Sequence, residues 1–319
     1  MRQAALTVRS FRFSTDEIPP RSRATAIREL HERGVVPLEP LRDHVAQVNV
    51  VKWFLPGAGI LCGRLGGVRQ VAASHTPDVG DDLFLGLNLA GRSIAVQRSR
   101  EVALEAGDAV FLSHDAGPFA LIRPTPVRFV GLRVPRRALA PLLGERNRPA
   151  MQLIARETPA LALVGAYVRA ITSAPVLASA EAAELAARHL RDLVALCAGA
   201  TREAAEEARG GVRAARLVAM KSDIAALLAD EALTVATLAA RHGVTPRYVH
   251  KLFESEGVTY TQFVLRQRLE RAHRMLRDSE FARHTIASIA YDVGFGDLSY
   301  FNRMFRRRFG ATPSDVRNL

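Results

Sequence analysis

The chain has 319 residues, of which 48% are hydrophobic, so it can hold two domains with apolar cores and is not a disordered protein. It contains no run of about 18 apolar residues, so no transmembrane helix is expected, and its first residues lack the apolar stretch of a secretory signal. The net charge of +12 favours a polyanionic partner such as a nucleic acid.

Residues 44–134 predict a domain of short strands. Apolar segments alternate there with glycine-containing turns, and the candidate strands are 44–54, 81–89, 92–97, 108–113 and 127–134. Many short strands at this spacing indicate a sandwich or a barrel. We therefore expect an N-terminal domain, residues 1–200, that is built around a β-barrel.

Helices are predicted on both sides of these strands. Before them, Pro20 can start a helix and Gly34 can end it. After them, residues 158–172 and 179–200 are predicted to be two helices, the second with an apolar stripe at helical spacing. The segment TREAAEEARGG at 201–211 is charged and ends in glycine, so residues 201–212 are expected to be an interdomain linker. A second domain would then cover 213–319.

Residues 234–253, TVATLAARHGVTPRYVHKLF, predict a helix-turn-helix unit. Thr234 can cap a short helix, and Gly243 allows the left-handed turn that leads to a second helix. Thr245 can cap that second helix, with Pro246 at its first position. Its inner face is apolar and its outer face polar; the outer residues are Arg247, His250, Lys251 and Glu254.

The same design recurs 51 residues later. Thr285 and Gly294 repeat Thr234 and Gly243, and Asp297 is the expected N-cap of a second polar-faced helix that runs to about 308. The exposed face of this helix is predicted to carry Ser299, Asn302, Arg303 and Arg306. Hydroxyl, amide and guanidinium groups are suited to base edges and phosphates. Two units in tandem therefore predict a DNA-binding domain.

One long amphipathic helix is predicted between the two units, at residues 260–278. Such a helix would fix the separation of the two recognition helices. Successive major grooves on one face of B-DNA lie about 34 Å apart. We therefore expect the recognition helices to enter two adjacent major grooves of one asymmetric site.

The sequence GFGDLSYFNRMFRRRFGATPSDVR at 294–317, with its upstream partner, resembles the DNA-binding domain of AraC/XylS-type transcriptional regulators. The resemblance covers about 213–319. It implies base contacts by seven residues, Arg247, His250, Lys251, Leu298, Ser299, Asn302 and Arg303. Leu298 stands where many relatives carry a polar side chain, so it either touches a thymine methyl or packs inward.

Phosphate contacts are expected from Thr245, Arg306 and Arg307. A solvated charge run is the alternative reading of the consecutive arginines.

The strand region is similar to the cupin-like sensor barrel of the same family, most clearly over residues 89–122. This resemblance implies a small-molecule effector in the barrel, and Trp53, Phe84 and Phe111 are the candidate lining residues. Core packing explains these three residues equally well. The helices at 158–172 and 179–200 either form a homodimer interface, as helices at this place often do in the family, or cap the barrel.

An enzymatic role is not predicted. A metal-dependent cupin needs histidines and a carboxylate around one ion, but the region offers His44, His75 and His114 with no HxH pair. Cys62 and Cys197 stand alone, so neither a disulfide nor a thiolate metal site is predicted. We expect no catalytic residues, no metal and no cofactor.

The sequence therefore predicts an α+β, sequence-specific transcriptional regulator modulated by an effector. An activator is favoured because activation is commoner among similar proteins. The expected partners are double-stranded DNA, RNA polymerase, the effector and a second copy of the chain. The expected location is the cytoplasm, on the nucleoid and not at a membrane. The alternative is a basic architectural DNA-binding protein without a sensor function.

Overall fold

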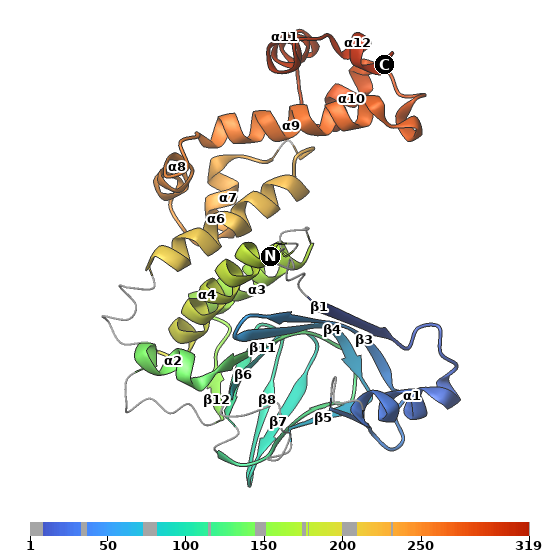
Figure 1. The fold of residues 1–319 in the computed structure, drawn as a ribbon, viewed down its shortest axis with the longest axis vertical. Helices are drawn as coiled ribbons and strands as arrows, with labels where there is room; N and C mark the ends of the chain where they lie inside the picture. The colour runs from blue at the N-terminus through green and yellow to red at the C-terminus, as the bar shows by residue number, and fades with distance from the viewer. Residues whose placement is uncertain are drawn as a thin grey trace, which may run out of the picture. The chain divides into compact units, whose positions relative to one another are not determined.

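The computed structural model describes residues 9–32, 37–72, 82–113, 116–143, 151–173, 177, 179–199, 209–230 and 232–318. The chain divides into two compact units between Arg216 and Leu217 (Figure 1). Of the predicted linker, residues 201–208 lie outside the described residues. Residues 209–212 form the first turn of helix α6 (Arg209–Ala226), which spans the junction of the two units.

The described strands of the N-terminal unit form two antiparallel sheets. In spatial order, sheet A contains β1 (Arg9–Ser14), β3 (Gln47–Leu55), β4 (Ala58–Gly66), β11 (Val127–Pro135), β6 (Asp82–Ala90), β9 (Ala109–Ser113) and β12 (Gln152–Ile154). Sheet B contains β2 (Leu38–Pro40), β5 (Val68–Ala72), β10 (Phe119–Arg123), β7 (Ser93–Gln97) and β8 (Arg100–Leu104). The α+β class is confirmed, with the predicted barrel realised as two sheets that are not closed into a cylinder.

Helices cover one face of sheet A (Figure 1). They are α3 (Pro159–Ser173) and α4 (Ala180–Cys197), and Ser179 caps α4 by accepting a hydrogen bond from the amide of Ala182. Gly165 of α3 lies against Leu87 and Leu89 of β6, since a Cβ added to it would be 3.6 Å from each side chain. The odd-numbered residues of β6 therefore face the helices.

The even-numbered residues of β6 face the other way, toward sheet B, because successive side chains of a strand point to opposite faces. The ring of Phe84 accordingly lies 5.9 Å from the ring of Phe119 on β10. Val110 and Leu112 of β9 join the same apolar cluster. The space between the two sheets thus contains one apolar core of the unit, and the helix-covered face of sheet A contributes further buried residues.

Helix α1 (Pro20–Glu32) begins at the predicted proline and packs against the core of the N-terminal unit. Ile27 and Leu30 of this helix pack with Val50 and Phe129 of sheet A. The predicted stop, Gly34, lies outside the described residues. A further short helix, α2 (Arg136–Leu143), follows β11.

The C-terminal unit contains the two predicted helix-turn-helix units. Besides the last part of α6, it holds α7 (Val235–Arg241), α8 (Pro246–Glu254), α9 (Tyr260–Arg277), a short 3-10 helix η3 (Ser279–Phe281), α10 (Ile286–Asp292), α11 (Leu298–Phe309) and α12 (Pro313–Arg317). The predicted N-caps are confirmed: the side chains of Thr234, Thr245, Thr285 and Asp297 each accept a hydrogen bond from a backbone amide of the helix that follows.

Helix α9 belongs to the cores of both helix-turn-helix units. Its first turns place Tyr260 and Phe263 in the cluster formed with α6, α7 and α8. Its last turns place Ala272 and Leu276 in the cluster formed with α10, α11 and α12. The two recognition helices are therefore mounted on one continuous helix, as the sequence predicted.

Both turns use a glycine with positive φ. Gly243 has a φ of 61° and Gly294 a φ of 94°. Around Gly243 nothing lies within 4 Å of an added Cβ, whereas a Cβ on Gly294 would overlap the carbonyl oxygen of Leu228 and lie 2.9 Å from Nε of Arg268. The second turn is thus packed closely beneath the hydrogen bond of 3.1 Å from Arg268 Nε to Leu228 O.

Candidate DNA-binding surface

Helix α8 presents the predicted polar face to solvent. Arg247, His250 and Lys251 are exposed, and so is the cap residue Thr245. The opposite face is fixed in the core, where Phe253 is completely buried. Because the apolar face is held in one orientation, the polar face of α8 is presented as a rigid surface.

Helix α11 repeats this arrangement. Ser299, Asn302 and Arg303 are exposed, while Phe301 and Phe305 are completely buried. The guanidinium of Arg303 lies 5.7 Å from the centre of the Tyr300 ring, which restricts the arginine on the solvent side of the helix. Leu298 is half-buried and packs against the core cluster of this unit, so its side chain points inward.

The three consecutive arginines of α11 have different surroundings. Arg306 and Arg307 are exposed and line the same hollow, whereas Arg308 forms an ion pair of 3.4 Å with Glu270 of α9. The pair turns Arg308 toward the supporting helix. Arg306 and Arg307 therefore line the solvent-exposed hollow, whereas Arg308 contacts the supporting helix α9.

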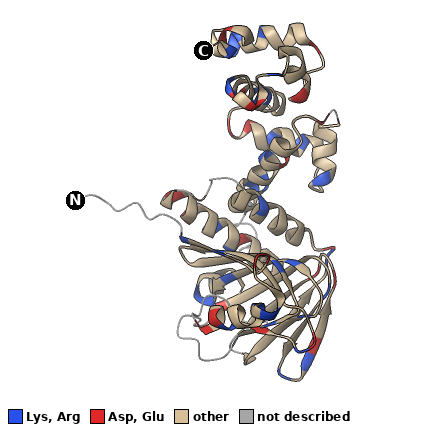
Figure 2. Ribbon diagram, turned by 90° about the vertical axis from the view of Figure 1, so that its right-hand side faces the viewer, with Lys and Arg blue, Asp and Glu red and all other residues tan. Residues whose placement is uncertain are grey.

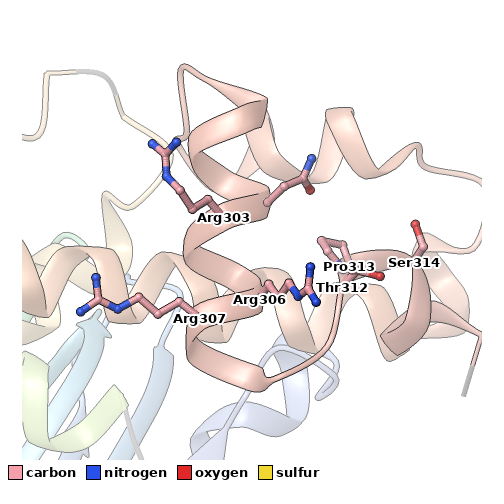
Figure 3. Close-up of a pocket in the computed structure, with 7 residues that line it drawn as sticks. Arg303, Arg306, Arg307, Thr312, Pro313 and Ser314 are labelled. Carbon is pink, nitrogen blue, oxygen red and sulfur yellow. The ribbon is translucent and has the colours of Figure 1, made fainter.

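A hollow of about 730 Å³ lies between α11 and the start of α12. Its lining consists of Asn302, Arg303, Arg306, Arg307, Thr312, Pro313 and Ser314. In Figure 3, Arg306 extends toward Thr312 and Pro313, while Arg303 and Arg307 extend from the other side of α11. Ser314 was not among the predicted contacts; the capping-box spacing of Thr312 and Asp315 is the sequence signal that places it at a helix start.

The carboxylate of Asp315 stays ionised beside this hollow. Hydrogen bonds from the hydroxyl and the amide of Thr312 lower the pKa of Asp315, and the nearby positive charge of Arg306 lowers it further. The capping box is therefore intact at neutral pH. It holds the start of α12 next to Arg306.

Charge alone does not identify this surface. Figure 2 shows lysine and arginine on both units, so the basic character of the chain is spread over the molecule. The distinguishing feature is arrangement, because only a fixed polar helix face combines amide and guanidinium groups at groove-reading positions.

We predict that Arg306→Ala weakens binding to all DNA sequences alike. A guanidinium that neutralises a phosphate contributes about 0.9 to the slope of log affinity against log salt concentration. Titrations of one duplex at several salt concentrations should show a slope shallower by about that amount. A change in the preferred base at any position would contradict the phosphate role.

The predicted effector residues lie on different faces of sheet A. Phe84 is half-buried and faces sheet B, whereas Phe111 pairs in register with Leu85 and lies on the side of the helices. Trp53 lies on the face of β3 opposite Val48 and Val50, which belong to the core between the sheets. Of the three, Phe84 is the one directed into the space between the sheets.

Of the three histidines considered as metal ligands in the strand region, the structure describes one. His44 is exposed, and His75 and His114 lie outside the described residues. Among the residues that the structure describes, no three histidine, cysteine, aspartate or glutamate side chains gather as a metal site. Cys62 and Cys197 are both free, and burial raises the pKa of the Cys62 thiol to about 11.

No helix in the described part of the chain is long and apolar enough to cross a membrane.

Two polar-faced helices in tandem helix-turn-helix units, joined by one supporting helix, define a DNA-binding protein. Comparison with known proteins gives the family. Residues 238–319 match the family model of a helix-turn-helix domain, and residues 44–197 match that of an AraC-binding-like domain.

The chain is similar to two curated transcriptional activators over most of its length. It is 29% identical to the transcriptional activator RhrA of Rhizobium meliloti (strain 1021), with 98% of both chains covered. It is 31% identical to the transcriptional activator NphR of a Rhodococcus species over 74% of this chain and 70% of the relative. The crystal structure of the AraC-like transcriptional activator CuxR covers 82% of this chain and 95% of its own, at 20% identity and a TM-score of 0.44. The chain belongs to the AraC/XylS-type family of DNA-binding transcriptional regulators.

Proposed function

We propose that the chain activates transcription by binding an asymmetric promoter site through α8 and α11 in adjacent major grooves. The observation that carries this proposal is the pair of exposed polar faces held by α9. In Figure 1 both helices are seen nearly end-on, so their axes run in similar directions. Parallel recognition helices on one support suit successive grooves on one face of a duplex.

Base reading is assigned to Arg247, His250 and Lys251 on α8 and to Ser299, Asn302 and Arg303 on α11. Asparagine pairs with adenine and arginine with guanine through two hydrogen bonds each, and such pairs specify sequence. Leu298, being half-buried, contributes at most an apolar contact with a thymine methyl. Thr245, Arg306 and Arg307 hold the register by contacts with phosphates.

The other partners follow from the activator role. Two relatives that align with most of the chain are named transcriptional activators, which supports activation and, with it, contact with RNA polymerase. A small-molecule effector in the N-terminal unit regulates DNA binding. Homodimerisation uses the exposed side of α4, where the side chain of Leu185 is 46% exposed.

Competition binding separates this proposal from its alternative, an architectural DNA-binding protein. A promoter fragment selected by genome-wide footprinting should outcompete random DNA by about 10³-fold or more. Equal competition by random DNA would favour the architectural role. The match of residues 44–197 to an AraC-binding-like domain supports the regulator, because an architectural protein needs no such unit.

A further inference from the structure

Among the described residues of the N-terminal unit, one arginine is buried with no counter-charge beside it. Arg123, the last residue of β10, is 1% exposed and forms no ion pair within the described residues. Its Nη1 donates a hydrogen bond of 3.1 Å to Oε1 of Gln70, and its Cζ lies 4.5 Å from the centre of the Phe129 ring. Its Nε is buried and has no hydrogen-bond partner in the part of the chain that the structure describes.

This arrangement is costly for a protein that only needs a packed core. A buried guanidinium requires a paired charge or a full set of acceptors, and a carboxamide and an aromatic face provide neither. Burial lowers the pKa of Arg123 to about 9, so the group still carries its positive charge at neutral pH. A buried donor left unsatisfied calls for a function or a bound ion.

Arg123 is directed into the space between the two sheets. It lies on the same face of β10 as Phe119 and Leu121, which belong to the core cluster there, and its contact with Phe129 reaches across to β11 of sheet A. Gln70 of β5 pairs in register with Leu121 and supplies its hydrogen bond from the neighbouring strand. Two strands of sheet B and one of sheet A therefore enclose the guanidinium.

The interior face of sheet A becomes more exposed toward one end. Phe54 is 43% exposed, Lys52 and Phe84 are half-buried, and Phe129 beside Arg123 is 1% exposed. Register places Lys52 on this face, because it pairs with Leu61, which pairs in turn with Gly131. The less buried end of this face thus carries two aromatic rings and a lysine.

The ring of Phe84 lies between this less buried end and Phe129, which contacts Arg123. It lies on Gly86 and Gly131, since a Cβ on either glycine would be 3.1 Å or 2.9 Å from the ring. The two glycines place no side chain of their own in the interior. A ligand that displaced the Phe84 ring would therefore lie over the two glycines, next to Leu121 and Val110.

We propose that the space between the sheets binds a small monocarboxylate with an apolar body, whose carboxylate pairs with Arg123. This inference rests on the proposed effector function and names the chemical class of the effector. The guanidinium offers Nε and its neighbouring N–H groups as a fork that matches the geometry of a carboxylate. The rings of Phe84, Phe119 and Phe129 provide apolar surroundings for the remainder.

The test uses thermal unfolding of the full chain. The probes are straight, branched and aromatic monocarboxylates of two to ten carbons, each measured beside its neutral primary amide. At least one acid, at about 100 times its Kd, should raise the melting temperature by about 5–10 °C while its amide does not. Arg123→Met should abolish this rise.

Arg69→Met is the matched control. Arg69 precedes Gln70 on β5 and is exposed on the outer face, so this variant should keep the full response. Without ligand, Arg123→Met should melt no lower than the parent chain, because replacing a buried unpaired charge by an apolar side chain removes a desolvation cost. A lower melting temperature for the ligand-free variant would assign Arg123 a structural role and overturn the inference.

Other outcomes are equally decisive. If no acid raises the melting temperature, or if the rise persists in Arg123→Met, the carboxylate site does not exist. A neutral molecule that alters promoter binding would overturn the carboxylate class while leaving the proposed function in place. Acid binding that depends on Arg123 but leaves promoter binding unchanged would support the site and contradict the effector role.

Discussion

Replacing Gly294 by alanine should destabilise the C-terminal unit by about 2–5 kcal/mol. The left-handed backbone costs a residue with a Cβ about 1–2 kcal/mol, and overpacking costs about 1–3 kcal/mol more. The added methyl group would overlap the carbonyl of Leu228 and press on Arg268. Denaturant unfolding followed by circular dichroism measures the loss, and DNA affinity should fall with it.

Gly243→Ala is the matched control for this prediction. Gly243 occupies the same position in the first unit, also with positive φ, but an added Cβ there meets nothing within 4 Å. We expect a loss of about 1–2 kcal/mol, since only the backbone conformation is penalised. Equal losses at the two glycines would show that the close packing of the second turn has no energetic consequence.

Removing the guanidinium of Arg303 should relax sequence preference at one base position. A bidentate contact with guanine discriminates against other bases by about 1–3 kcal/mol, which corresponds to about 5- to 150-fold in affinity. Selection from a pool of randomised duplexes, before and after Arg303→Ala, would identify the position. The salt dependence should change little, because a base contact neutralises no phosphate.

Arg308→Ala provides the comparison on the same helix. Its guanidinium is paired with Glu270 on the supporting helix, so its removal should leave the selected sequence unchanged. An unchanged base preference in Arg303→Ala would mean that the exposed face of α11 does not read the groove. The assignment of α11 as a recognition helix would then fail.

The helical unit was predictable from sequence because its determinants are local. The caps Thr234, Thr245 and Asp297 act within three residues of their own position, and apolar periodicity gives the buried face of each helix. The start of α6 was not anticipated, since residues 209–212 resemble a flexible segment in composition. They are helical because they continue into the rest of α6, from which the predicted linker boundary at 212 divided them.

The sheet unit was predictable as a class but not in the orientation of its side chains. Strand β9 is buried on both faces, so no alternation of polar and apolar residues distinguishes Phe111 from Val110. The register with β6 decides the question by placing Phe111 beside Leu85. Arg123 had no sequence signal, because a buried arginine in a strand reads like any surface arginine until its neighbours are known.

The shared helix α9 has a consequence for the promoters that this chain would regulate. Each base pair inserted between the two subsites would move the second by about 3.4 Å and swing it by roughly a tenth of a turn. A hinged protein could follow such a shift, but a continuous helix anchored in both cores cannot. The base pairs between the two subsites should therefore differ in sequence from one regulated promoter to the next, but their number should stay constant.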